Sequence, residues 1–163
     1  MKRPLPPLLF ALGVALILVS EYLPGAEAFP AWTRIVGAIA MSAGLILLVI
    51  ARLQFAKAKT NILTFGEPGQ LVTTGVFRLS RNPMYLGFAL LLLGLALAMR
   101  SLPAVCVAAA FALITDRWYI GFEERWLSAK FGAAYEAYAC RTRRWLGWSR
   151  TSPSQPARPT SSN

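Results

Sequence analysis

Four long apolar segments dominate the chain, and shorter polar or charged segments separate them. A helix that crosses a bilayer needs roughly 20 mostly apolar residues, with about 17 as the lower limit. The first two segments reach this length with their flanks, and the last two reach it only with their polar ends near the membrane surface. The pattern predicts spans at about residues 5–23, 34–52, 83–99 and 102–122. We therefore expect an all-α integral membrane bundle of about four transmembrane helices.

Composition and charge also favour a membrane protein. The chain of 163 residues is 56% hydrophobic, with a mean hydropathy of +0.49, whereas a soluble domain is about 45–50% apolar. Its net charge is +10, from 17 Lys and Arg against 7 Asp and Glu. Because the basic residues flank the apolar segments, anionic lipid headgroups account for them better than nucleic acid does. We expect the lipid bilayer as a partner, and no nucleic acid.

The distribution of basic residues predicts how the spans are oriented. Lys and Arg are concentrated at the N-terminus, in the second loop at about 52–82 and in the C-terminal tail, while only Arg34 and Arg100 lie on the opposite side. The positive-inside rule places the basic segments in the cytoplasm. We expect a multi-pass protein with cytoplasmic N- and C-termini, in the inner (plasma) membrane of a bacterium.

The two ends of the chain need separate interpretations. Met1–Ala28 also fits a signal peptide, because it has a basic start, an apolar stretch and Ala26-Glu27-Ala28 before Phe29. The apolar stretch continues through Leu23, which favours retention as the first span; cleavage would leave three spans. We expect residues 1–150 to form a single domain. The Ser/Pro/Thr-rich residues 151–163 are expected to form a disordered tail. Before this tail we expect a C-terminal amphipathic helix that lies in the membrane interface.

The chain has no histidine and two cysteines, Cys106 and Cys140. A histidine general base, a histidine metal ligand and a Ser-His-Asp triad are therefore excluded within this sequence. The two cysteines lack the spacing of a zinc site. We expect two free thiols and no metal site.

The third and fourth apolar segments form the most informative part of the sequence. A tight turn near Arg100 joins them, so the two helices must run antiparallel and residues equally far from the turn lie at the same depth. Asn82 is then level with about Tyr119, and Glu123 lies only about 6 Å further along the axis. The sequence therefore predicts that Ser80–Tyr85 and Asp116–Glu124 meet at the cytoplasmic end of one hairpin.

Two kinds of chemistry are open at this end of the hairpin. Pro83 suits the first turn of a helix, with Ser80 or Asn82 as its cap, and such a helix start favours an anionic group. The adjacent carboxylates Glu123 and Glu124 either form salt bridges, or bind a cation or vicinal hydroxyls. The basic side chains that can form these salt bridges are Arg81, Arg125 and Arg78.

Two further features have two interpretations each. Asp116-Arg117 is either a local ion pair or part of a cavity. Phe131, Tyr135 and Tyr138 recur at helical spacing within an aromatic and basic segment. That segment is either an interfacial membrane anchor or a lid over the cytoplasmic end of the hairpin.

These residues resemble the two motifs of one enzyme family. Arg81-Asn82-Pro83-Met84-Tyr85-Leu86-Gly87 is similar to the Arg-His-Pro-x-Tyr-x-Gly motif of the isoprenylcysteine carboxyl methyltransferase and phospholipid methyltransferase superfamily. The segment from Glu123-Glu124 through Phe131-Gly132 to Tyr138 resembles its second motif. The resemblance covers roughly Leu71–Trp145, and the two motifs occur in the family's order.

The resemblance implies a small helical membrane enzyme that binds S-adenosylmethionine at its cytoplasmic side. Where the chain has Asn82, members of the family often have histidine; asparagine keeps a donor and an acceptor but does not titrate near neutral pH. The resemblance leaves the catalytic residue open, with Arg81, Tyr85, Arg117 and Glu123 as candidates. It implies that the cofactor is bound by Arg81, Asn82, Pro83, Tyr85, Gly87, Glu123 and Glu124.

The implied reaction is methyl transfer to a lipophilic or small acceptor. A carboxylate, such as that of a prenylcysteine-like group, is favoured because it is already a nucleophile and needs no base. A phospholipid amine, a phenolic lipid and a small thiol stay open, and so does the oligomeric state. Two alternative functions are an NADPH-dependent membrane reductase of the sterol type and a non-enzymatic membrane protein.

Overall fold

The computed structural model describes residues 6–22, 28–58 and 69–148, and within these residues every regular element is a helix. The expectation of an all-α fold is confirmed. Ala26-Glu27, which belong to the alternative interpretation as a signal peptide, and the tail 151–163 lie outside the described residues. The elements are α1 (Pro6–Ser20), α2 (Thr33–Lys57), the 3-10 turn η1 (Gly75–Arg78), α3 (Pro83–Ala98), α4 (Leu102–Ile114), the π-helical turn η2 (Thr115–Ile120), α5 (Gly121–Phe131) and α6 (Ala133–Arg141).

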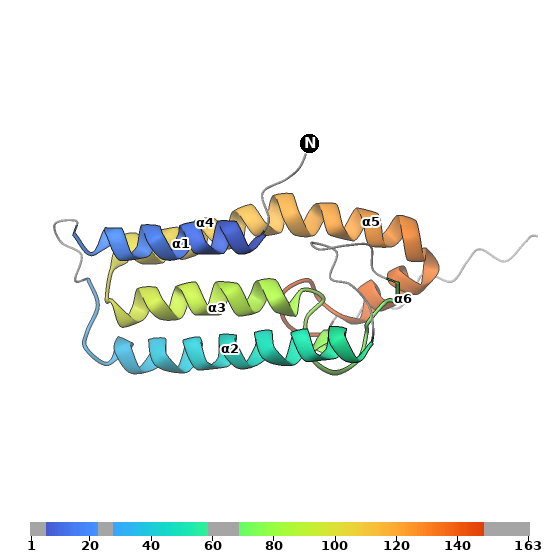
Figure 1. Ribbon diagram of the computed structural model, residues 1–163, viewed down its shortest axis with the longest axis horizontal. Coiled ribbons are helices and arrows are strands. Elements are labelled where there is room, and N and C mark those ends of the chain that lie inside the picture. Colours follow the sequence, from blue (N-terminus) through green and yellow to red (C-terminus); the bar gives the residue numbers. More distant parts are fainter. Residues whose placement is uncertain (1–5, 23–27, 59–68, 149–163) are drawn as a thin grey trace, which may run out of the picture.

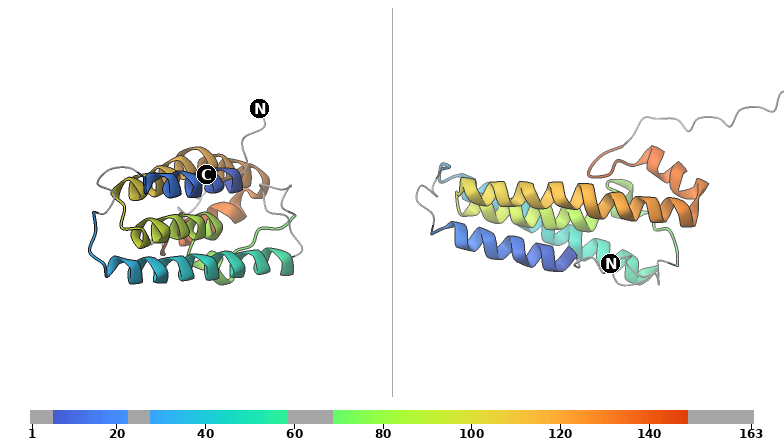
Figure 2. Two further views of the ribbon diagram at one scale, coloured as in Figure 1. Left: turned by 60° about the vertical axis from the view of Figure 1, so that its left-hand side comes forward. Right: turned by 90° about the horizontal axis from the view of Figure 1, so that it is seen from above.

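The helices form three layers. Figure 1 shows α2 on one side, α3 in the middle and α1 beside α4 on the other side. The α4 helix continues through η2 into α5, so that a helical stretch from Leu102 to Phe131 extends past the end of α3. The α6 helix then turns back beneath α5, at the end of the bundle where α3 begins (Figures 1 and 2).

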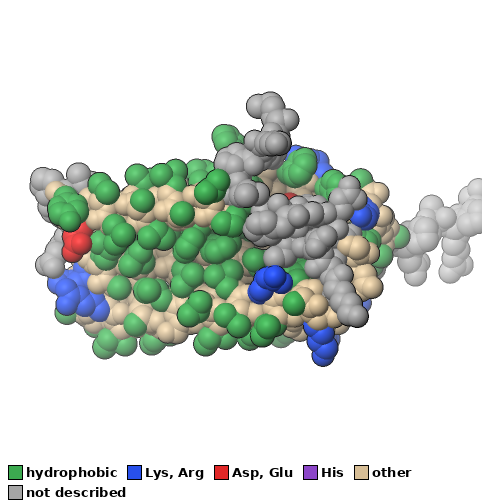
Figure 3. All heavy atoms as spheres, in the orientation of Figure 1, with side chains coloured by type: hydrophobic (Ala, Val, Ile, Leu, Met, Phe, Trp, Pro, Cys, Tyr) green, Lys and Arg blue, Asp and Glu red, His purple; other side chains and the backbone are tan. Residues whose placement is uncertain are grey.

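Two of these helical stretches are long and apolar enough to cross a membrane. They are α2, with 25 residues, and Leu102–Phe131, with 30 residues. The apolar helices α1 and α3 are shorter, with 15 and 16 residues, so a count of four spans stays a prediction. Figure 3 shows hydrophobic side chains across the middle of the molecule, with Lys and Arg toward its two ends. The outward side chains of α2 include large apolar ones that are mostly exposed: Ile35, Ile39, Leu45, Ile46 and Leu53.

Small residues form the contact between α2 and α3. Gly37 lies against Gly94, and Gly44 lies against Gly87, so each helix contributes two glycines that are seven residues apart. A Cβ added to Gly37 would lie 2.5 Å from the Gly94 carbonyl oxygen, and one added to Gly44 would lie 2.7 Å from the Gly87 carbonyl oxygen. Close backbone approach through small residues is typical of helix pairs in membranes, where lipid competes for large apolar side chains. This glycine seam fixes the position of α3.

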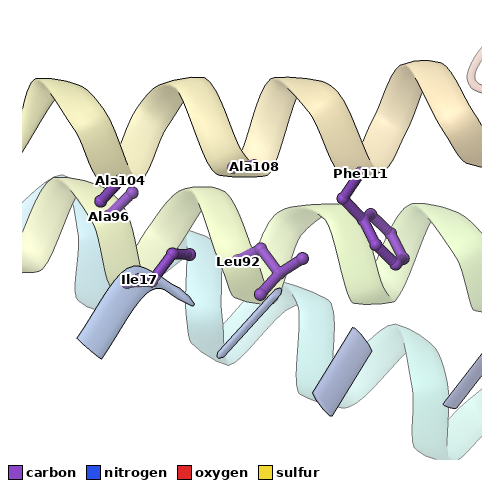
Figure 4. Close-up of a cluster of buried hydrophobic side chains, with 6 residues drawn as sticks. All are labelled: Ile17, Leu92, Ala96, Ala104, Ala108 and Phe111. Carbon is purple, nitrogen blue, oxygen red and sulfur yellow. The ribbon is translucent and has the colours of Figure 1, made fainter. Parts of the chain in front are cut away.

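A second contact joins α3 to α1 and α4. Ile17 and Leu92 are fully buried between the helices and pack against the small residues Ala96, Ala104 and Ala108 (Figure 4). The α3–α4 turn is closed by Arg100, which has a positive φ of 59°, and by Ser101, whose hydroxyl accepts a hydrogen bond from the backbone N–H of Ala104 at 3.3 Å. The antiparallel hairpin predicted from the sequence is thus observed.

The helix that begins at Leu102 differs from the expected span in two ways. It does not end near residue 122 but continues to Phe131, and η2 inserts one π-helical turn into it. A π-helical turn has wider spacing than an α-helix and so rotates every later side chain about the axis. Gly132, with a φ of 50°, ends α5. Phe131, Tyr135 and Tyr138 are therefore divided between two helices, and an interfacial position of α6 stays a prediction.

Candidate functional site

A pocket of about 110 Å³ lies where α3 begins, between the ends of α1, α2, α5 and α6. One end of the pocket is polar, with Arg81, Asn82, Tyr85 and Glu123 in its wall. The remainder is almost entirely apolar. Its apolar lining consists of Pro6, Pro7, Phe55, Leu71, Val72, Phe77, Pro83, Met84, Phe88 and Leu127, and Gln70, Tyr135 and Tyr138 also line the pocket.

Tyr85 and Glu123 connect the two halves of the site. The Tyr85 hydroxyl donates a hydrogen bond to Oε1 of Glu123 at 2.7 Å, although the residues are 38 positions apart in the sequence. Tyr85 is buried, with 6% of its surface exposed. This contact confirms the prediction that the start of α3 and the acidic pair of α5 meet at one end of the hairpin. Because both side chains line the pocket, a polar ligand there would contact them together.

Glu124 has a different role from its neighbour. It does not line the pocket; instead it forms a salt bridge with Arg81 at 3.1 Å and a second with Arg144. The side chains of Glu124 and Arg81 are each only 16% exposed. The two interpretations of the acidic pair therefore apply to different residues: Glu124 is ion-paired, while Glu123 faces the pocket.

Asn82 occupies the N-cap position of α3 but does not cap it. Its side chain makes no capping hydrogen bond, which corrects the expectation of a side-chain cap. Instead, its Nδ2 donates to the Arg144 carbonyl oxygen at 3.2 Å, and its backbone N–H donates to the Ser80 hydroxyl at 3.0 Å. Pro83 stands at the first helical turn, as predicted, and is fully buried. The beginning of α3 is therefore fixed by contacts with the segment after α6.

Gly87 and Arg117 are predicted site residues that the structure does not bring into the pocket. Gly87 lies in the glycine seam, where an added Cβ would be 2.9 Å from the Gly44 carbonyl oxygen. Arg117 has 78% of its side chain exposed and lies 3.7 Å from Asp116. Arg117 is not among the residues that line the pocket. Arg117 thus forms the local ion pair that the sequence also allowed and lies outside the pocket lining.

The α6 helix forms one wall of the pocket. The Tyr138 hydroxyl donates to the Phe77 carbonyl oxygen at 2.6 Å and so ties α6 to η1. Burial, with a smaller contribution from Glu124, raises the pKa of Tyr135 to about 12, and burial also raises the pKa of Tyr138. The two tyrosine side chains of α6 are thus buried against η1 and the pocket.

Sequence reasoning does not assign Trp145 to this site, and it offers Arg144 only together with Arg81 and Arg117, as an arginine that can hold a carboxylate. The Arg144 guanidinium contacts both Asp116 and Glu124, and the Trp145 indole N–H donates to Asp116 at 2.8 Å. One signal in the sequence pointed toward them, because Asp116 and Glu124 add negative charge where basic residues prevail. The sequence alone does not choose among Arg81, Arg117 and Arg144 for that role.

Comparisons with known proteins agree with this geometry. Residues 32–134 match the family model described as phospholipid methyltransferase. The chain is 32% identical over 140 residues to protein-S-isoprenylcysteine O-methyltransferase A of Arabidopsis thaliana, covering 80% of this chain and 69% of that protein. It is 30% identical over 136 residues to protein-S-isoprenylcysteine O-methyltransferase B of the same plant, covering 77% and 68%. No solved structure matches the chain.

Proposed function

Because this chain belongs to the phospholipid methyltransferase family and is a membrane methyltransferase, we propose that it transfers the methyl group of S-adenosylmethionine to a lipophilic acceptor at the cytoplasmic face. The single observation that carries this proposal is the convergence of Arg81, Tyr85 and Glu123 on one pocket whose remaining wall is mostly apolar. The family match favours this function over a sterol-type reductase or a non-enzymatic protein.

The polar end of the pocket fits the groups that S-adenosylmethionine presents. Nε of Arg81 is buried and has no hydrogen-bond partner, so it can donate to a carboxylate. Glu123 can accept hydrogen bonds from an ammonium group or from a ribose diol, and the Tyr85 hydroxyl holds it in place. Asn82 and Pro83 complete this end of the pocket. Glu124, which does not line the pocket, forms a salt bridge with Arg81.

The bound cofactor supplies a methyl group activated by a sulfonium, and the protein orients the two reactants and excludes water from the site. Good orientation alone contributes on the order of 7–11 kcal/mol to such a reaction. Phe55, Phe77, Phe88 and Leu127 exclude water from the acceptor side of the pocket. A carboxylate acceptor needs no base, which suits a chain without histidine. A carboxylate attached to an apolar chain, as in a prenylcysteine, therefore fits this pocket best.

The position of the pocket suggests how such an acceptor reaches it. Pro6 and Pro7 belong to the first turn of α1, and Phe55 belongs to the last turns of α2; all three line the pocket. An apolar chain can then enter from the bilayer between these two helices. With a multi-pass arrangement and cytoplasmic termini, this end of the bundle lies at the cytoplasmic face of a bacterial inner membrane.

Binding of S-adenosylmethionine tests the proposal. We would measure it by calorimetry on the detergent-purified chain, with Glu123→Gln as the site variant and NADPH as the competing cofactor. Glu136→Gln is the matched control, because Glu136 is an exposed glutamate of α6. The proposal predicts micromolar-range binding to wild type and to Glu136→Gln, weakened at least tenfold in Glu123→Gln. Binding of NADPH alone, or of neither cofactor, would contradict it.

A further inference from the structure

The segment after α6 returns to the start of α3. We call residues 142–148 the C-terminal strap. Within the strap, the Arg143 N–H donates to the Gly147 carbonyl oxygen at 2.9 Å, and Thr142 pairs with Trp148. The Arg81 N–H donates to the Arg143 carbonyl oxygen at 3.0 Å, and the Gly147 N–H donates to the Leu79 carbonyl oxygen at 2.8 Å. The strap is thus bonded to the backbone of the first sequence motif.

Arg144 contacts the rest of the site through both its backbone and its side chain. Its carbonyl oxygen accepts hydrogen bonds from the Ser80 hydroxyl and from Nδ2 of Asn82, each at 3.2 Å. One nitrogen of its guanidinium lies 3.2 Å from both carboxylate oxygens of Asp116. Its other nitrogens donate to both carboxylate oxygens of Glu124. A single side chain therefore holds two carboxylates that belong to different turns of the long helix.

The charged side chains of this cluster form a row of ion pairs in which positive and negative charges alternate. Glu124 lies between two cations, because it pairs with Arg81 on one side and with Arg144 on the other. Hydrogen bonding to Glu124 raises the pKa of Arg144 above its ordinary value, and Asp116 adds to this. Lysine can replace arginine here only in part, since it lacks the planar guanidinium whose five donors reach both carboxylates at once. Arg144 itself does not line the pocket, whereas Arg81 does.

We propose that Arg144 is a positioning residue that holds Arg81 in the orientation in which it faces the cofactor pocket. Arg144 acts through Glu124, because it supplies the second cation that this carboxylate needs. Without it, Glu124 depends on Arg81 alone for compensation of its charge and draws that guanidinium away from the pocket. Removal of one partner from a partly buried ionic network leaves the other charges uncompensated. This inference rests on the proposed cofactor site.

The test compares Arg144→Ala and Arg144→Lys with Arg143→Ala in the full-length, detergent-purified chain. Arg143 is the matched control, because its side chain is exposed and its contacts described above come from its backbone. Calorimetry gives the Kd for S-adenosylmethionine, and thermal unfolding reports whether each variant is folded. We expect Arg144→Ala to weaken binding at least tenfold, Arg144→Lys to weaken it less, and Arg143→Ala to stay within twofold of wild type.

Chemical rescue separates positioning from general stability. About 20 mM guanidinium ion supplies the missing planar donor without unfolding the protein, and we expect it to restore binding to Arg144→Ala but not to alter wild type. Unchanged affinity in folded Arg144→Ala would overturn the proposal, as would an equal loss in Arg143→Ala. Should Arg144→Ala fail to fold, Arg144→Lys decides: wild-type affinity in that variant overturns the proposal.

A readout without cofactor distinguishes failure of this inference from failure of the proposed function. Absence of S-adenosylmethionine binding by wild type counts against the proposed function alone. Amide hydrogen exchange in residues 79–82 then decides the role of Arg144, since the Arg81 N–H is bonded to the strap. We expect faster exchange in Arg144→Lys than in wild type or Arg143→Ala. Identical exchange in all three would overturn the positioning role.

Discussion

The glycine seam leads to a prediction about Gly87, which sequence reasoning assigned to the cofactor site. The perturbation is Gly87→Ala, compared with Gly94→Ala at the equivalent contact seven residues further along α3. An added Cβ at position 87 would lie 2.9 Å from the Gly44 carbonyl oxygen and 2.7 Å from Cγ of Leu48. At position 94 it would lie 2.6 Å from the Gly37 carbonyl oxygen and 2.7 Å from the Met41 backbone nitrogen.

The magnitude follows from these distances. Ordinary contact begins at 3.4 Å, so the α2 and α3 backbones must separate by roughly 0.5–0.8 Å, and overpacking of this kind destabilises a core by about 1–3 kcal/mol. Alanine recovers up to ~1 kcal/mol through its higher helix propensity. With that recovery complete, the net loss is up to about 2 kcal/mol, which lowers the thermal midpoint of a chain of this size by up to roughly 8 °C.

The assay is thermal unfolding in detergent at one fixed scan rate, together with calorimetry of S-adenosylmethionine at a temperature where all variants are folded. Gly69→Ala is the control, because nothing lies within 4 Å of its added Cβ. We expect both seam variants to lose thermal stability and to keep their cofactor affinity. A Gly87→Ala protein with a wild-type midpoint and weakened binding would refute the packing role and return Gly87 to the cofactor site.

Three further predictions concern the ion pairs and tyrosines around the pocket. Glu124→Gln should lower the thermal midpoint more than Glu123→Gln does, because Glu124 pairs with two arginines, and Glu123→Gln should weaken cofactor binding without that loss. Tyr138→Phe removes the hydrogen bond to Phe77 and should destabilise the protein by about 1 kcal/mol in thermal unfolding. Since burial raises the pKa of Tyr135 to about 12 from 10.0, its contribution to stability is complete below about pH 10 and is lost toward pH 12; Tyr135→Phe should flatten this alkaline decline.

The parts of the fold that could be predicted from the sequence depend on local pattern and simple geometry. Apolar segments of helical length predicted the helices, and a short turn at Arg100 required an antiparallel hairpin. Equal depth along that hairpin then brought Tyr85 near Glu123, which their 2.7 Å hydrogen bond confirms. These inferences succeed because the rise per residue of a helix is nearly constant.

The parts that could not be predicted depend on long-range contacts or on local departures from regular helix. Arg144 lies 62 residues beyond Asn82, and no periodicity links the two. The π-helical turn of η2 changes which side chains after Ile114 face inward, so regular α-helical spacing does not describe how Asp116 lies relative to Glu123. Gly87 shows the converse difficulty, since a glycine in a motif can serve either a ligand or a neighbouring helix.

Transfer of a labelled methyl group is the measurement that tests the central claim most directly. The chain would be reconstituted in liposomes with S-adenosylmethionine labelled in its methyl group and with a prenylated N-acetylcysteine as acceptor. Phosphatidylethanolamine in the same vesicles offers the competing amine, and Glu123→Gln serves as the site control. We predict a base-labile methyl ester of the prenylated acceptor, formed by wild type and strongly reduced in Glu123→Gln. Label in the phospholipid amine alone would contradict the carboxylate acceptor, and no transfer to either acceptor would contradict the proposed activity.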